Sequence, residues 1–180
     1  KGDLLMVVKN NYFWLDPSSP MGFVANGELA RIDRVRKFEA FYGFEFAQLD
    51  LRFVDYPDQA PITCLVHIQS LHEEGPSLNR EVLRKLFYAI EAEHTDIKNK
   101  QKRYREVLKN PYFNALQVKF SYAITCHKSQ GGQWKTVFIE QPYLPDGVSK
   151  EYYRWLYTAI TRAQEKLYLI GFREDYFDND

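Results

Sequence analysis

The hydrophobic period of this chain changes at Gly75-Pro76-Ser77. Before these residues, apolar and polar side chains alternate, most clearly over 44–54, as they do in half-buried strands. After them, apolar residues recur with the period of a helix as far as Leu108. The 180 residues suffice for one domain or two small ones. Strands are therefore expected before residues 75–77, and helices are expected after them.

Several short strands separated by turn residues are expected in residues 1–75. The stretch 22–35 is expected to form a hairpin centred on Asn26-Gly27, because both residues of that pair tolerate positive φ. Further strands are expected over 3–8, 44–54 and 62–68. Four or five short strands of this kind indicate a small barrel.

The segment 76–110 is expected to form one long amphipathic helix or two shorter ones, ending at Asn110-Pro111. Its apolar residues fall on one side of a helical wheel: Leu83, Leu86, Phe87, Ile90, Ile97, Tyr104 and Leu108. A third region, 111–180, is expected to contain strands over 116–125, 136–140 and 166–170 and a helix over 150–163. Strand, loop, strand, helix and strand in this order indicate an α/β fold.

Charge restricts the partners that this chain could bind. The 24 basic and 24 acidic residues give a net charge of zero, so a polyanion would have to bind to a local patch. One such patch has a single opposing acid, Glu106, and consists of Lys98, Lys100, Lys102, Arg103, Arg105 and Lys109. The patch is either a solvated helix face or a site for backbone phosphates. With two cysteines and no signal peptide or long apolar segment, a cytoplasmic location and no membrane partner are expected.

A polar loop with paired glycines lies in residues 122–134, YAITCHKSQGGQW. Loops at the carboxyl ends of strands carry ligand sites in α/β sheets, and Gly131-Gly132 would let backbone N–H groups approach a phosphate. Side chains of several lengths accompany the glycines: Thr125, His127, Lys128, Ser129, Gln130 and Gln133. The alternative is an ordinary polar surface loop.

A second stretch, WLYTAITRAQEKLYLIG over residues 155–171, places Arg162 near the end of an expected helix. An arginine there commonly binds the last carbonyl groups of the helix. It can also bind a phosphoryl group with two parallel hydrogen bonds, as an arginine finger does. Both roles remain open at this point.

The two stretches together resemble motifs V and VI of superfamily 1 DNA helicases, most closely the RecD-like and Dda-like branch. ITCHKSQGGQW resembles motif V, and LYTAITRAQEKLYLIG resembles motif VI, in the expected order. More weakly, GDLLMVVKNN and FVANGELARIDRV resemble the SH3-like barrel inserted in the second motor domain of that branch. The helix expected over 79–108 has no counterpart in this resemblance.

The resemblance implies a fold for each region. Residues 1–75 would form the SH3-like β-barrel, 76–110 the helical segment, and 111–180 the C-terminal part of RecA-like domain 2A with motifs V and VI. The fold class would be α/β, of the P-loop NTPase helicase type.

The resemblance also implies roles for individual residues. Arg162 would contact the γ-phosphate of ATP and stabilise charge during hydrolysis. Gly131, Gly132 and Gln133 would lie near the ribose and phosphates, with Gln133 replacing a glutamate of many relatives, including the UvrD type. Five residues of the loop would contact single-stranded DNA or couple it to the nucleotide: Thr125, His127, Lys128, Ser129 and Gln130.

The sequence contains neither a G-x-x-x-x-G-K-[ST] phosphate loop nor the Asp-Glu pair of a Walker B strand. Residues 1–180 alone are therefore not expected to hydrolyse ATP. They would belong to a longer parent that uses ATP and Mg²⁺ and carries an upstream motor domain, and the lack of an initial methionine agrees with this expectation. That parent would be a DNA helicase or the helicase subunit of an exodeoxyribonuclease, with a nuclease subunit as a further partner. The alternative is a non-catalytic nucleic-acid-binding or interaction module with a helicase fold.

Three other interpretations concern small groups of residues. Cys64, His67, Cys126 and His127 could supply four zinc ligands, although neighbours such as Cys126 and His127 point to opposite faces of a strand, so no metal site is expected. The same geometry argues against a Cys126–His127 nucleophile pair. Aromatic residues near a loop could stack on bases or belong to the barrel core and rim: Tyr12, Phe13 and Trp14.

Overall fold

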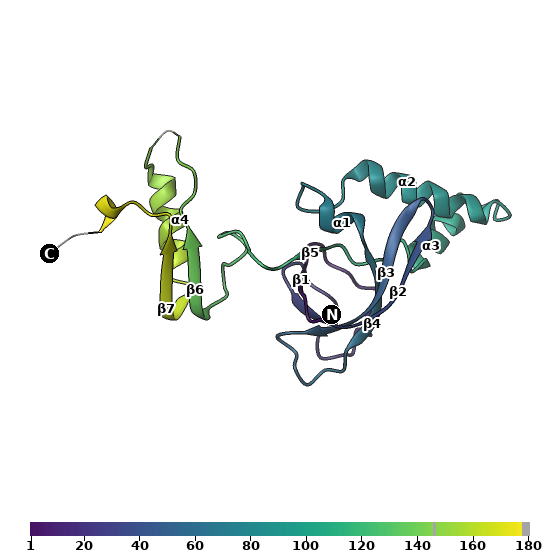
Figure 1. The fold of residues 1–180 in the computed structure, drawn as a ribbon. Coiled ribbons are helices and arrows are strands. Elements are labelled where there is room, and N and C mark those ends of the chain that lie inside the picture. Colours follow the sequence, from purple (N-terminus) through teal and green to yellow (C-terminus); the bar gives the residue numbers. More distant parts are fainter. Residues whose placement is uncertain (146, 178–180) are drawn as a thin grey trace. The chain divides into compact units, whose positions relative to one another are not determined.

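A computed structural model describes residues 1–145 and 147–177. The chain divides into two compact units, Lys1–Tyr122 and Ala123–Asp180 (Figure 1). This division lies at residue 122, whereas the sequence placed the boundary of the last region at residue 110. Residues 111–122 belong to the first unit because they complete its sheet and its core. None of the described helices is both long and apolar enough to cross a membrane.

Unit 1 is built on an antiparallel sheet in the order β4-β3-β2-β1-β5 (Figure 1). The strands are β1 (Leu4–Val7), β2 (Leu29–Phe41), β3 (Phe44–Phe53), β4 (Ile62–His67) and β5 (Val118–Phe120). Just before β5, Leu116 joins the other edge of the sheet through a parallel bridge to Val66. The N–H of Leu116 donates to the Leu65 carbonyl at 2.7 Å, and the His67 N–H donates to the Leu116 carbonyl at 2.9 Å. The sheet therefore closes on itself, while its likeness to SH3 barrels stays a prediction.

The hairpin of this sheet forms at a different place from the one that the sequence predicted. Tyr42 and Gly43, with φ of 56° and 75°, join β2 to β3 as the two central residues of a tight turn. Asn26-Gly27 does form a turn, with φ of 98° at Gly27, but β2 pairs with β1 and β3, so the predicted hairpin pairing is wrong. An Asn-Gly pair favours only the local turn, whereas pairing depends on which apolar faces are buried.

The helical segment contains two helices, α2 (Arg80–Glu91) and α3 (Lys100–Lys109), after a short α1 (Gln69–His72). A 3-10 turn, η1 (Ala92–His94), and five further residues separate α2 from α3. Asn79 and Asn99 cap the two helices, each side chain accepting from a backbone N–H three residues on. Asparagine competes for backbone groups inside a helix and satisfies free N–H groups at its start, so it favours two helices over one.

Both helices pack on one side of the sheet (Figure 1). The shared core contains Phe46, Leu65, Leu86, Ile90, Val107 and Ala115, all buried. A second core inside the closed sheet includes Val7, Val24, Leu51, Val66 and Val118. The helical segment is therefore part of unit 1.

His67 lies in this unit with only 2% of its surface exposed, and its ring packs against those of Phe44 and Phe46. The Gln69 amide donates to its Nδ1 at 2.9 Å in the amide orientation that satisfies both groups. Its Nε2 has no hydrogen-bond partner among the described residues. Burial lowers the pKa of His67 from 6.5 to about 4.

Because the folded pKa of His67 is lowered, the unfolded chain binds the proton more tightly. His67 should therefore leave stability unchanged above pH 6.5 and lower it as the pH falls toward 4, by up to about 3 kcal/mol. Urea unfolding at several pH values should show this loss in the wild type and a smaller loss in His67→Asn, whose side chain can still accept from Gln69. An equal loss in both proteins would exclude His67 as its source.

Unit 2 contains two parallel strands, β6 (Trp134–Glu140) and β7 (Ala163–Ile170), joined by α4 (Lys150–Ile160) (Figure 1). A short 3-10 turn, η2 (Glu174–Tyr176), follows. The strands and helix expected over 136–140, 150–163 and 166–170 are confirmed, apart from shifted ends.

The strand expected over 116–125 is correct only for 118–120, which forms β5 in unit 1. The sequence predicted that the polar loop follows a strand of the same α/β sheet. Among the described residues, no strand of the β6–β7 sheet directly precedes the loop, so this prediction is wrong. The backbone groups of the loop are used in successive turns: Lys128 and Ser129 N–H donate to the Thr125 carbonyl, and Gly132 N–H donates to that of Ser129. These bonds remove the donors and acceptors that an adjacent strand would need.

Candidate functional site

The polar loop, residues 125–133, is held together by a buried serine. Ser129 is 7% exposed, and its hydroxyl donates to the Cys126 carbonyl at 2.7 Å. The thiol of Cys126 in turn donates to the carbonyl of Trp155 in α4 at 3.4 Å. The loop is thus anchored on α4, and the Ser129 side chain supports the loop from inside.

Arg162 joins the end of α4 to this loop. Its Nε donates to the Thr158 carbonyl at 2.9 Å, and its Nη1 donates to the Gly132 carbonyl at 3.1 Å. Its Nη2 donates to the Thr161 hydroxyl at 3.0 Å. The backbone adds a further link, because the Trp134 N–H donates to the Arg162 carbonyl at 2.9 Å. The two stretches that resemble motifs V and VI therefore meet at the pair Arg162–Gly132.

The other predicted residues of the loop are exposed, and only some of them line a cavity. Gly131 lies at the surface with φ of 86°. The amide of Gln133 accepts from that of Gln164 at 3.5 Å. His127 and Gln130 line a cavity of about 500 Å³ between the loop and α4, whereas Thr125 and Lys128 lie outside its lining.

A comparison with known families places the polar loop inside a region similar to a helicase domain. Residues 120–170 match the UvrD-like helicase C-terminal domain. The matched region contains the polar loop, α4, β6 and β7, and it supports a relationship to superfamily 1 helicases.

One curated relative also matches part of the chain. An uncharacterized protein of Methanocaldococcus jannaschii, MJ1519, is 47% identical over 60 residues. The match covers 33% of this chain and 5% of that protein. The chain thus corresponds to a small part of the relative, and the similarity transfers no activity by itself.

Within the helicase-like region, Gly132 lies directly against an aromatic ring. A Cβ added at Gly132 would lie 2.4 Å from Cη2 of Trp134, well inside contact distance. An alanine at position 132 would therefore force the indole of Trp134 to move.

Gly132→Ala should displace the indole of Trp134 and lower the stability of unit 2 by about 1–3 kcal/mol. Tryptophan fluorescence and thermal unfolding would measure the two effects. The double variant Gly132→Ala/Trp134→Leu removes the obstructing ring and should recover part of the lost stability. A single variant with unchanged fluorescence and unfolding would contradict this packing.

The cysteine near the site is better suited to packing than to nucleophilic chemistry. Burial raises the pKa of the Cys126 thiol, against the opposing effect of the Arg162 charge. Burial also raises the pKa of Cys64. In the part of the chain that the structure describes, no group of three or more His, Cys, Asp or Glu side chains is arranged to hold a metal ion.

The sequence reasoning missed the aromatic wall of the cavity beside the loop. Tyr152 and Trp155 of α4 line it, with ring centroids 5.9 Å apart and planes 22° from parallel. Arg154 and Thr158 of the same helix complete this wall. The signal was present in the helical spacing of Tyr152 and Trp155, but the sequence analysis used these residues only to predict a helix over 150–163.

Proposed function

We propose that residues 1–180 form the C-terminal part of an ATP-dependent DNA helicase of superfamily 1, of the RecD-like or Dda-like branch. The observation that carries the proposal is the hydrogen bond from Arg162 to the Gly132 carbonyl. It joins the end of the motif VI helix to the motif V loop, so both sequences take part in one local site. An arginine that only capped its own helix would not need this partner.

The donors around Arg162 fit a nucleotide phosphate. A guanidinium has five N–H donors, and the three recorded hydrogen bonds leave two of them for phosphate oxygens. The bonds to Thr158 and Thr161 fix the plane of the guanidinium before any anion arrives. The N–H of exposed Gly131 makes no hydrogen bond among the described residues and can donate to the same ligand.

ATP would supply the γ-phosphoryl group, whose transfer to water drives movement. In this proposal Arg162 binds that group and stabilises its charge, and Gly131, Gly132 and Gln133 form the adjacent surface. Mg²⁺ would be held by residues of the upstream motor domain, since the phosphate loop and the Walker B acids are missing from this sequence.

The sheet of unit 2 supports its assignment to a larger motor domain. Parallel sheets are normally covered on both faces. Yet Phe138 of β6 and Tyr168 of β7 stack at 4.7 Å while 65% and 46% exposed. In the proposal, further strands and helices of the RecA-like domain extend this sheet and cover these rings.

The cavity beside the polar loop is the proposed contact for single-stranded DNA. His127 and Gln130 supply hydrogen-bonding groups, and Trp155 supplies an apolar surface on which a base can rest. Thr125 and Lys128 are exposed next to them and can reach the sugar-phosphate backbone. Ser129 supports this surface from inside the loop.

Duplex unwinding by the full-length parent tests the proposal. With ATP, the parent should separate the strands of a duplex that has a single-stranded tail, and it should not do so with a non-hydrolysable analogue. The 180-residue chain should hydrolyse no ATP. A parent that binds DNA without hydrolysing ATP would instead support the non-catalytic binding module.

A further inference from the structure

Two exposed cations of the helix α3, Lys102 and Arg105, are three residues apart and so lie on one side of the helix, which we call the basic face. The helicase resemblance does not explain this basic face. Residues 98–109 contain six cations and one acid, although the whole chain is neutral. Arg103 pairs with Glu91 at 3.3 Å, and Lys109 pairs with Glu106 at 2.8 Å. Among the described residues, four exposed cations of this run form no ion pair: Lys98, Lys100, Lys102 and Arg105.

This arrangement opposes the stability of α3 itself. The first turn contains no acidic residue, so Lys100 and Lys102 face the positive end of the helix dipole. Like charges three or four residues apart, such as Lys102 and Arg105, add repulsion. A surface kept at such a cost in stability is suited to a polyanion that would neutralise it.

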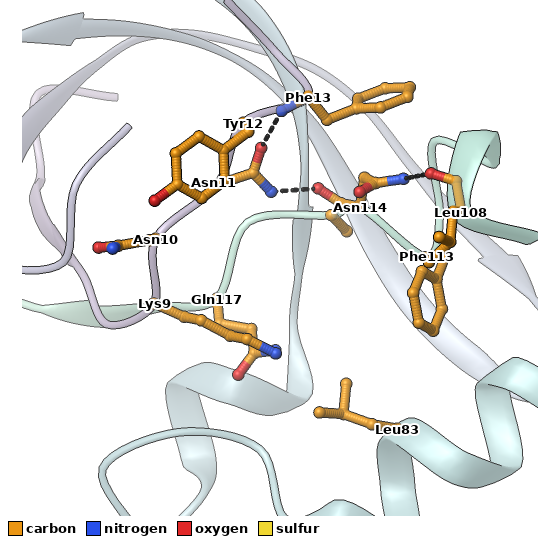
Figure 2. Close-up of a pocket in the computed structure, with 11 residues that line it drawn as sticks. Lys9, Asn10, Asn11, Tyr12, Phe13, Leu83, Leu108, Phe113, Asn114 and Gln117 are labelled. Carbon is orange, nitrogen blue, oxygen red and sulfur yellow. Dashed lines mark hydrogen bonds between the residues drawn. The ribbon is translucent and has the colours of Figure 1, made fainter. Parts of the chain in front are cut away.

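A pocket lies beside Leu108 of α3 (Figure 2). Leu108 of α3 lines it, and Arg105 lies one helical turn before Leu108. The cavity measures about 390 Å³ and is bounded on its other side by the loop from Lys9 to Phe13. Asn11 fixes that loop, its side chain donating to the Asn114 carbonyl at 2.8 Å and accepting from the Phe13 N–H at 3.0 Å.

The pocket offers an aromatic ring with one free face. Tyr12 stacks on Phe23 with ring centroids 4.7 Å apart, yet it is 68% exposed. Lys9 and Asn10, which also line the pocket, are exposed beside it. Trp14 differs, because its indole N–H donates to the Asn114 carbonyl at 2.7 Å and holds the loop in place.

We propose that the basic face of α3 and the pocket beside Leu108 together bind a single strand of nucleic acid. Phosphates lie along Lys102 and Arg105, and a base stacks on the free face of Tyr12. The pairing of cations with an open aromatic ring favours a nucleic acid over an acidic peptide, since a carboxylate chain has nothing to stack. The site lies wholly in unit 1, whereas Arg162 belongs to unit 2.

The test uses the 180-residue chain and a short fluorescein-labelled oligothymidylate, with anisotropy measured across a series of salt concentrations. Lys102→Gln/Arg105→Gln should lower the slope of log affinity against log salt by about 1.4, the value for two phosphate contacts on a single strand. Arg31→Gln/Arg34→Gln removes two exposed arginines from β2 and should leave the slope unchanged.

A second pair of variants tests the stacking. Tyr12→Leu should weaken binding about tenfold with little change in the salt slope. Tyr122→Leu is the matched control, because Tyr122 is 73% exposed and stacks on Phe120 outside the pocket. Equal effects of both tyrosine variants would contradict base stacking on Tyr12. Competition by polyglutamate as strong as that by unlabelled oligothymidylate would also contradict it. Binding lost only through changes at His127 and Gln130 would contradict this second site and leave the proposed function intact.

Discussion

Replacing Arg162 by alanine in the full-length parent is expected to lower the kcat for ATP hydrolysis by about a hundredfold or more. Arginine fingers contribute about 10³–10⁵ to the rate of phosphoryl transfer. The side chain is already held at three points, by Thr158, Gly132 and Thr161, so little reorganisation is needed when charge develops. DNA-stimulated phosphate release measures the effect.

Two further variants separate the chemical role of Arg162 from a structural one. Lys166→Ala removes an exposed cation of β7 and should leave turnover unchanged. Arg162→Lys keeps the charge but not the planar set of donors and should recover only part of the rate. If Arg162 merely held the loop, the KM for ATP would rise while kcat stayed close to that of the wild type, and the finger assignment would be wrong.

Phe46→Ala is expected to lower the free energy of unfolding of unit 1 by about 3–5 kcal/mol. Phe46 is fully buried on β3, with its ring 4.9 Å from that of His67 and 5.1 Å from that of Tyr112. It packs in the same core as Leu86 of α2 and Val107 of α3, so its removal opens a cavity between the sheet and the helices. Urea unfolding followed by circular dichroism measures the loss.

Phe38→Ala is the matched control, since Phe38 is 71% exposed on the neighbouring strand β2. This variant should change the free energy of unfolding by less than about 0.5 kcal/mol. The signals from helix and strand should also change together, because α2, α3 and the sheet share one core. Similar losses in both variants, or helices that unfold well before the sheet, would contradict the description of residues 1–122 as one unit.

Much of the fold could be predicted from hydrophobic period and turn chemistry. The alternation over 44–54 predicted β3, and the helical period after Pro76 predicted the apolar face of α2. The face predicted for α3 is wrong, because Tyr104 and Leu108 are exposed and Val107 is buried instead. The partner strands of β2 could not be predicted in this way. Asn26-Gly27 signals a turn wherever it occurs, and only the burial of distant residues such as Leu116 determines how the sheet closes.

The sequence indicated the two stretches that meet in the candidate site but not the contacts between them, and the roles of their residues stay predictions. The resemblance of the two stretches to helicase motifs V and VI indicated Gly132 and Arg162. Their hydrogen bond could not be predicted, because it depends on how α4 packs against the loop. Ser129 shows the same limit: its hydroxyl resembled a ligand donor in the sequence, but in the structure it is buried and bonded to Cys126.

The most direct test of the central claim is ATP turnover by the full-length parent, measured with and without single-stranded DNA. Membership of a helicase motor predicts hydrolysis that rises strongly when DNA is added, because the proposed function couples strand binding to the nucleotide site through the loop next to Arg162. A parent that binds single-stranded DNA but hydrolyses no ATP under either condition would contradict the claim.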